Sequence, residues 1–509
     1  MYLVIALAIV FTTNSANAAG ENGREFGDMC ALYRLLIQPI AEPKLATSDG
    51  STSQTITDEL TTLKEKIVKL NLTVLEPQME KVLRDKENYG TANKILAADS
   101  KVKDYFTGLS TDIVSLMIAQ YPKTQTGDQA DKDFITKFKL PLTEQKRQAL
   151  RKAMKALTDK GLQTARSVET LATAITNSRI EARRALITAL YGISFAEGVS
   201  QEVLGAESNF NDIPQPAKFP WGNNNDRDTT CAEADGKPAK AGNTLATDMV
   251  CLCVSDNSGN VDACGDADIG ADAEISAGTA QAAAQKHFTA LTTECKKQAE
   301  TTPKLTATSL STAIAGFYGQ LGKNARTDTT APIEATSQPH KRHNYYGIFV
   351  FKNSQAPTCR SATFTLTTQA TGHCIDYTAL LTKNKQIPWI AKLSEAETAM
   401  DKIKEEFHQA SVFLTEMTGV TTQMESLLLI GDLFNQAKSS VPGTDKNTQL
   451  TTEEEIKCKA ATNKTADQCK ELDCDHDPAA NKCKPKQTGT ETSKEINHYQ
   501  TPFHDHDRK

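Results

Sequence analysis

Cysteine is the residue type in this 509-residue sequence with the widest possible chemistry, because a thiol can be oxidised, bind a metal or act as a nucleophile. The sequence has 12 cysteines, and this even number favours complete pairing in an oxidising compartment. Structural zinc sites need Cys/His pairs at short spacing, and the last four cysteines contain no Cys-x-x-Cys. We therefore expect disulfides, and no metal site, at Cys30, Cys231, Cys251, Cys253, Cys264, Cys295, Cys359, Cys374, Cys458, Cys469, Cys474 and Cys483.

The spacing of the cysteines restricts their pairing without fixing it. Only one residue separates Cys251 from Cys253, too little chain for a relaxed bridge between them, so each should pair with a different, distant partner. The cysteines before residue 375 and the four near the C-terminus are far apart in sequence. We expect these two sets to pair separately, and the connectivity within each set stays open.

Histidines are the next candidates for chemistry. His287, His340, His343 and His373 fall within one irregular region, but no Gly-x-Ser-x-Gly elbow, His-Glu-x-x-His motif or Gly-rich phosphate loop occurs in the sequence. A catalytic triad depends on geometry, which composition cannot supply, so we interpret these histidines as surface or structural residues. No catalytic residue or cofactor site is predicted, and a secreted enzyme is the least favoured of the alternatives.

Two short acidic and histidine-containing segments could bind a metal weakly. They are Asp475-His476-Asp477 and His504-Asp505-His506. Both are short and lie near the C-terminus, so adventitious binding is the most that we expect of them.

Two Asn-x-Thr sequences are possible acceptors of N-linked glycans, at Asn71-Leu72-Thr73 and Asn463-Lys464-Thr465. Asn463 lies between two cysteines of the terminal cluster, where an exposed small module is expected, and is the favoured site. Asn71 lies on a predicted helix. For Asn71, a used and an unused site both stay open.

The N-terminal segment predicts entry into the secretory pathway. An apolar run from Tyr2 to Thr12 is followed by Ala16-Asn17-Ala18, as in a signal peptide cleaved after Ala18. A retained membrane anchor is the alternative, but it would need roughly 20 apolar residues. The printed C-terminus is polar and lacks the hydrophobic tail that signals a glycolipid anchor. The net charge of -6 comes without a basic cluster, so no nucleic-acid partner is expected.

Residues 31–230 contain no cysteine and must therefore be held by packing. Their apolar residues recur at intervals of three and four, the spacing of a helical seam. This pattern predicts a helix over 60–74 and a long helix over 144–195, with Gly161 and Thr164 interrupting the seam. Turn-forming residues between the two indicate a long helical hairpin, with a broken first arm as the alternative. We interpret the apolar stripe as core and not as a cofactor groove.

The second half of the sequence changes character twice. Residues 214–278 are rich in Pro, Gly, Asp and Asn and predict an irregular cross-linked lobe, beside strands over 346–351 and 361–367. Helical spacing returns over 388–438, where we expect a third long helix packed along the hairpin. The predicted fold is mainly α and elongated, with minor β. The predicted parts are a signal peptide (1–18), a helical N-terminal domain (19–440), a linker (441–457), a cysteine-rich domain (458–484) and a polar disordered tail (485–509).

Four features together resemble the trypanosome variant surface glycoproteins. They are the segment from Glu25 to Leu32 around Cys30, the sequence Met249-Val-Cys251-Leu-Cys253, the pair Cys264-Gly265 and the terminal group of four cysteines. The Phe-x-x-x-Cys entry and the Cys-Leu-Cys arrangement resemble the B-type N-terminal domain more than the A-type. The resemblance extends over nearly the whole mature sequence.

The resemblance implies a rod-like N-terminal domain with lobes at its ends, which forms dimers or trimers side by side on the outer face of the plasma membrane. It implies a coat that acts as a steric shield and shows variable loops to host antibodies in immune evasion. It also implies a lipid anchor, which this C-terminal tail does not encode, and without one the protein would be extracellular. A surface receptor of the same helical-hairpin type, binding a host serum protein, is the alternative.

Overall fold

The computed structural model describes residues 20–46, 53–254, 263–265, 274–297, 302–327, 339–351, 356–359, 371–439, 465–471, 474–478 and 482–484. It divides into two compact units, Met1–Leu433 and Phe434–Lys509. Several predictions lie outside the described residues: the signal peptide with cleavage at Ala18, the strand over 361–367, the linker, the tail, Cys458, Asn463, His504 and His506.

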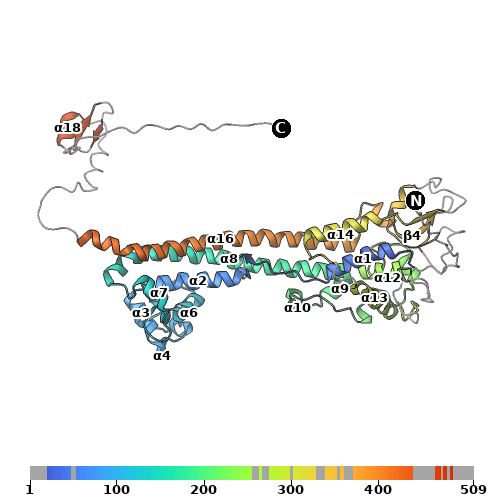
Figure 1. The fold of residues 1–509 in the computed structure, drawn as a ribbon, viewed down its shortest axis with the longest axis horizontal. Helices are drawn as coiled ribbons and strands as arrows, with labels where there is room; N and C mark the ends of the chain where they lie inside the picture. The colour runs from blue at the N-terminus through green and yellow to red at the C-terminus, as the bar shows by residue number, and fades with distance from the viewer. Residues whose placement is uncertain are drawn as a thin grey trace, which may run out of the picture. The chain divides into compact units, whose positions relative to one another are not determined.

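Two long antiparallel helices form the backbone of the first unit, α8 (Glu144–Tyr191) and α16 (Pro388–Ser439) (Figure 1). With 48 and 52 residues, they are about 72 and 78 Å long at about 1.5 Å per residue. Thr143 caps the start of α8, and Gly192 follows its last residue with a φ of 86°. Both predicted helices and the elongated, mainly helical fold are confirmed.

A third, shorter helix, α2 (Ile56–Leu72), packs against α8. It begins with a capping box at Thr55 and buries Leu60, Leu63 and Ile67, as the seam predicts. However, α2 has only 17 residues. The broken first arm is therefore the correct alternative, and α16 is the helix that matches α8 in length. Side chains join the long pair directly, with Ser178 Oγ 3.1 Å from Glu406 Oε2 and Lys160 Nζ 3.0 Å from Glu416 Oε1.

The prediction that Gly161 and Thr164 interrupt the seam is wrong. Both residues are buried within the continuous helix α8. A Cβ atom at Gly161 would lie 2.7 Å from Ile67 Cδ1 and 3.3 Å from Val420 Cγ1. Gly161 therefore lies where the three helices approach closely, and the missing side chain makes room for α2 and α16.

Residues 75–143 form a helical lobe at one end of α8. Apolar residues from its short helices pack on Val68 and Leu72 of α2 around Ile95, Phe106 and Val114. Capping side chains begin several of the helices, including Thr91 and Asp131. The elements are α3 (Pro77–Arg84), α4 (Lys86–Tyr89), α5 (Ala92–Leu96), η1 (Lys103–Phe106), α6 (Thr111–Gln120), η2 (Tyr121–Thr124) and α7 (Lys132–Phe138).

The other end of the first unit carries the head, defined here as α1 (Gly23–Leu36) and the described residues of 219–387 (Figure 1). In its sheet, of order β3-β4-β5, β4 pairs parallel with β3 and antiparallel with β5. This confirms minor β structure and the strand predicted over 346–351. The other elements are α11 (Arg227–Cys231), α12 (Leu245–Cys253), α13 (Ala280–Lys297), α14 (Ala307–Gln320), β3 (Ala325–Thr327), η6 (Pro339–Asn344), β4 (Tyr345–Phe351), β5 (Gly372–Asp376) and α15 (Thr378–Leu381).

Short elements lie between the head and the rest of α8, and buried arginines of α8 hold the chain there. Arg179 Nε donates to Ile40 O at 3.0 Å, and Arg183 Nη2 donates to Ser208 O at 2.9 Å. Both side chains thereby satisfy backbone carbonyls of non-helical chain. The elements are the antiparallel pair β1 (Leu45–Ala46) and β2 (Ser53–Gln54), α9 (Ile193–Ala196), α10 (Gln201–Gly205) and η3 (Pro216–Lys218).

The second unit contains α18 (Ala466–Glu471), β6 (Asp475–Asp477) and β7 (Lys482–Lys484). The two strands pair antiparallel, and Cys469 and Cys483 are bridged. Cys474 is also disulfide-bonded. A unit this small depends on its bridges, because it can bury little apolar surface.

Candidate functional site

Four disulfides cross-link the head: Cys30–Cys295, Cys231–Cys251, Cys253–Cys264 and Cys359–Cys374. The eight cysteines before residue 375 thus pair among themselves, as expected. Cys251 and Cys253 have different partners, which confirms that prediction. Their partners are not distant in sequence, since the separations are 20 and 11 residues. The turn-rich chain around them allows these short loops to close.

Asn22 joins three parts of the head at the start of α1. Its side-chain amide donates to Leu252 O and to His373 O, both at 2.8 Å, and its Oδ1 accepts from Ile348 N at 2.8 Å. The residue is fully buried. One amide therefore satisfies backbone groups of α12 and of two neighbouring strands, which an apolar side chain could not do.

Arg227 also satisfies buried backbone groups, in the chain around two disulfides. Its guanidinium is fully buried and donates to Cys251 O at 2.7 Å, to Val254 O at 2.6 Å and to Cys359 O at 3.2 Å. Its planar fork of five N–H donors suits three carbonyls that come from different segments. Loss of this side chain would leave several buried carbonyls without a partner.

Asp248, on α12, is a fully buried acid of the head. Its Oδ2 accepts from Tyr377 Oη at 2.6 Å and from Trp389 Nε1 at 2.8 Å, and its Oδ1 accepts from Gly242 N at 2.6 Å. Burial raises the pKa of this carboxyl to about 6, although the three hydrogen bonds act in the opposite direction. Asp248 thus links α12 to the first turn of α16.

Backbone hydrogen bonds and disulfides of the head hold the chain ends that border segments outside the described residues. Ala263 N donates to Cys253 O at 3.3 Å beside the Cys253–Cys264 bridge, and Gly372 N donates to Thr358 O at 3.0 Å beside the Cys359–Cys374 bridge. The sequence segments that follow Val254 and Cys359 therefore leave from, and return to, fixed points on the head.

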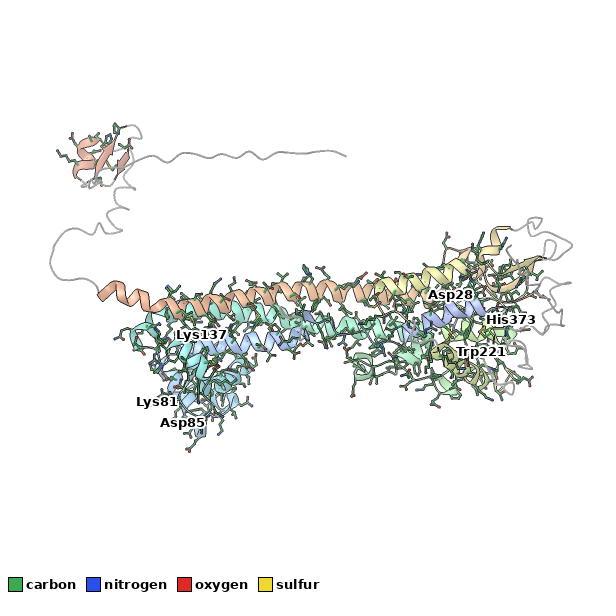
Figure 2. The ribbon with its side chains drawn as sticks, in the orientation of Figure 1. Asp28, Lys81, Asp85, Lys137, Trp221 and His373 are labelled. Atoms are coloured by element: carbon green, nitrogen blue, oxygen red, sulfur yellow. A yellow bond between two sulfur atoms is a disulfide. The ribbon has the colours of Figure 1, made fainter. Side chains whose placement is uncertain are left out.

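The histidines singled out from the sequence lie on different elements in the described part of the head. His287 is buried on α13, and His343 is exposed within η6. His373 is buried in β5, where burial and the nearby positive charge of Arg227 lower its pKa well below the usual value. The side chain of His340 is not described. Figure 2 places His373 in the head with Asp28 and Trp221.

The described residues contain no group of three His, Cys, Asp or Glu side chains that could hold a metal ion. Asp475, His476 and Asp477 lie on β6 of the second unit. Asp248, whose pKa is raised to about 6, has no surface exposure, and its oxygens already accept three hydrogen bonds. Its geometry fits a structural link and gives a substrate no access.

Two of the hollows in the described part of the first unit are considered as candidate binding surfaces. One, of about 530 Å³, lies beside the head between Ile193, Trp221 and Lys392. The other, of about 200 Å³, lies in the helical lobe next to Asn71, which is part-exposed in the last turn of α2. Figure 2 shows the two ends of the unit, with Lys81, Asp85 and Lys137 in or beside the helical lobe.

Sequence reasoning missed Asn22, Arg227 and Asp248. Asp248 did carry a usable signal, because it is the single charged residue between Leu245 and Cys253 in an apolar stretch. Asn22 precedes α1 at the position of an N-cap, although its side chain does not cap the helix. Arg227 has no local signal for this role, since its three carbonyl partners lie 24, 27 and 132 residues away.

A family model, VSG_B, described as the trypanosomal VSG domain, matches residues 4–418. The chain belongs to the trypanosomal VSG domain family. The match extends over the head, the helical lobe and more than half of α16, and it confirms the resemblance to the B-type VSG domain. Comparison with curated proteins gave no match. In this VSG-domain protein, none of the described helices is both long and apolar enough to cross a membrane.

Proposed function

We propose that this VSG-family protein is a surface coat glycoprotein, which acts as a steric shield and shows variable loops to host antibodies. The observation that carries the proposal is that the two ends of the first unit differ. Its cross-linked head lies at one end of the α8–α16 pair, and α16 runs from there to the other end, where the second unit begins at Phe434 near the end of this helix. A stiff spacer of about 70 Å would hold the head away from a membrane to which the C-terminal part is attached.

The proposal includes a lipid anchor, side-by-side homo-oligomers of two or three copies, and antibodies as the main external partners. The family assignment supports a cell-surface location. Disulfides support an oxidising compartment. The function proposed here is steric and antigenic and involves no bond-making chemistry.

Labelling of exposed lysines on living cells would test the shield. Lys237 and Lys323 are exposed in the head, and Lys81 and Lys86 are exposed in the helical lobe. A bulky, membrane-impermeant amine reagent should label the head lysines equally on cells and on purified protein. It should label the lobe lysines at least tenfold less on cells, because neighbouring copies cover that end. Equal labelling of both pairs on cells, or no surface labelling, would refute a packed coat with the head outward.

The hollow beside the head favours a second candidate, a receptor for a host serum protein. Its volume of about 530 Å³ lies in the range of ligand sites, and its lining includes half-exposed Ile193, buried Trp221 and Lys218. Capture of one serum protein at a 1:1 ratio, lost in Ile193→Asp and kept in Val412→Asp, would favour the receptor. Val412 is the matched control because it is similarly exposed on α16, at 55% against 51%.

A further inference from the structure

The hollow in the helical lobe has features that the coat function does not use. It lies between α2, η1, α6 and α8, and its volume is about 200 Å³. Most drug-sized ligands occupy roughly 300–1,000 Å³. The hollow is therefore small for an independent ligand, and it suits a group of about one ring that is held in place by a covalent attachment.

Asn71 supplies a possible attachment point at this hollow. It lies in the last turn of α2, is part-exposed and lines the cavity. Thr73, the third residue of its Asn-x-Thr sequence, is buried, and its hydroxyl donates to Leu70 O at 2.7 Å. Transfer of a glycan to a nascent chain precedes folding, so this hydrogen bond in the folded state does not prevent it. After folding, a sugar attached to Asn71 would begin at the opening of the cavity.

The lining of the cavity fits a sugar ring. Leu75, Met79 and Leu109 give it an apolar floor, and Tyr105 is 49% exposed at its side. An N-acetylglucosamine ring has an apolar face and an acetyl methyl group that can cover such a surface, and aromatic rings provide large rigid apolar area for such contacts.

A polar edge accompanies this apolar floor. Arg151 is fixed there, since its Nε donates to Val74 O at 2.9 Å and its Nη2 to Leu75 O at 3.2 Å. Asp159 and Lys155 form an ion pair of 2.8 Å on the same side. These groups can exchange hydrogen bonds with sugar hydroxyls, while the ring covers the apolar floor.

We propose that Asn71 carries an N-linked glycan whose first N-acetylglucosamine packs into this cavity against Tyr105. The packed sugar covers apolar surface of the helical lobe, which has no disulfide to hold it. This inference rests on the proposed function only in requiring passage through the secretory pathway.

The first experiment measures occupancy in the full-length protein secreted from eukaryotic cells, by mass spectrometry of glycopeptides. We expect one glycan on Asn71, lost in both Asn71→Gln and Thr73→Val. Asn463 is the internal reference. If Asn463 is modified and Asn71 is not, the inference is wrong and the proposed secretion stands. If neither is modified, both the inference and the glycoprotein part of the proposed function are wrong.

The second experiment measures packing, as the rate at which an N-glycosidase removes the Asn71 glycan from the native protein. Tyr105→Ser should increase this rate at least tenfold, because the sugar loses the ring beside it. Tyr318→Ser is the matched control, since Tyr318 is also part-exposed, at 36%, but lies on α14 in the head. Equal rates in the wild type and in Tyr105→Ser would show that the glycan does not occupy the cavity.

Discussion

The head and the helical lobe are stabilised by different interactions. Both must hold short, irregularly connected elements at an end of the α8–α16 pair. The head does so with four disulfides and buried polar side chains that bind distant backbone groups. The lobe has no cysteine between residues 75 and 143, and relies on helix caps, a small apolar core and ion pairs. The difference indicates that resistance to unfolding is concentrated in the head.

The carboxyl groups show the same contrast. In the head, burial raises the pKa values of Glu25, Asp28, Asp248 and Asp376. In and around the helical lobe, cations and hydrogen bonds leave the pKa values below their usual range. There, burial of Glu80 and Glu425 is outweighed by Arg or Lys partners, burial of Asp112 is outweighed by hydrogen bonds from Ser110 and Lys64, and Asp131 is held low mainly by Lys69. The raised and the lowered pKa values contribute to stability in opposite directions as pH falls, and in the head the lowered pKa values of Asp235 and His373 act against the four raised ones.

Removal of the Cys30–Cys295 bridge should have the largest effect. It joins α1 to α13 across 265 residues, and a loop of that length corresponds to roughly 5 kcal/mol of unfolding free energy in the chain-entropy account. Both tryptophans, Trp221 and Trp389, are buried in or beside the head, so their fluorescence during urea unfolding measures this loss.

The matched control is the double variant Cys359→Ala/Cys374→Ala, which opens a loop of 15 residues and should cost about 3 kcal/mol. Hydrogen exchange in residues 75–143 should be unchanged in both variants. Increased exchange there after loss of the Cys30–Cys295 bridge would show that the two regions unfold as one, contrary to the comparison.

The next effect concerns pH. The pKa of Asp248 is raised from 3.8 to about 6, so the folded head binds a proton more tightly than the unfolded chain. The contribution of Asp248 to the stability of the head should therefore rise as pH falls from about 7 to 4, by up to about 3 kcal/mol at 1.36 kcal/mol per pKa unit. Buried His373 acts in the opposite direction below its usual pKa of 6.5, because its pKa is lowered in the folded head. Asp248→Asn should therefore lower the stability at pH 4 relative to that at pH 7, compared with the wild type, in tryptophan-monitored unfolding.

The helical lobe supplies the comparison for this prediction. Its carboxyls have lowered pKa values, so their contribution is present above the unfolded pKa near 4 and is lost as pH falls below it. Hydrogen exchange in the lobe should accelerate in that acid range in the wild type and in Asp248→Asn alike. An Asp248→Asn variant whose head stability depends on pH as it does in the wild type would contradict the assignment of Asp248.

A smaller effect is expected where α2, α8 and α16 meet. Gly161→Leu places a side chain against Ile67 and Val420, and overpacking of this kind costs about 1–3 kcal/mol. Gly419→Ala on α16 is the control. A Cβ there meets nothing within 4 Å, so the change should stabilise the protein by about 0.5–1 kcal/mol. Thermal unfolding followed by circular dichroism measures both, and equal effects of the two would contradict the close approach at Gly161.

Gly161 also marks the limit of what periodicity can predict. The helices over 144–195 and 388–438 were predictable within a few residues, because a long apolar seam needs only local spacing. Whether a glycine in that seam breaks the helix or admits a neighbour depends on Ile67 and Val420, which lie far away in sequence. The short helices of the lobe were not predicted, since segments of four or five residues have no measurable period.

The sequence was enough to predict that the head contains disulfides. It was not enough to predict how the residues of the head are arranged in space. Cysteine type and number predicted disulfides, but the pairing of Cys30 with Cys295 depends on the packing of α1 on α13. The contact of Asn22 with His373 O joins residues 351 positions apart, and no local pattern encodes it. Asn71 could be recognised as a sequon, whereas the cavity beside it exists only after α2, η1 and α8 have packed.

The smallest effect is expected within the lobe. Glu80 accepts from Arg84 Nη2 at 2.6 Å and from Arg147 Nη1 at 2.9 Å, which ties α3 to the start of α8. Glu80→Gln should cost about 1 kcal/mol, because the cluster is partly exposed and screened by salt. Asp159→Asn, in an exposed pair with Lys155, should cost less than about 0.5 kcal/mol. Hydrogen exchange of α3 and α6 at low and high salt measures the difference. If Glu80→Gln left this exchange unchanged at low salt, ion pairs would not be what holds the lobe, and its small apolar core would have to account for its order alone.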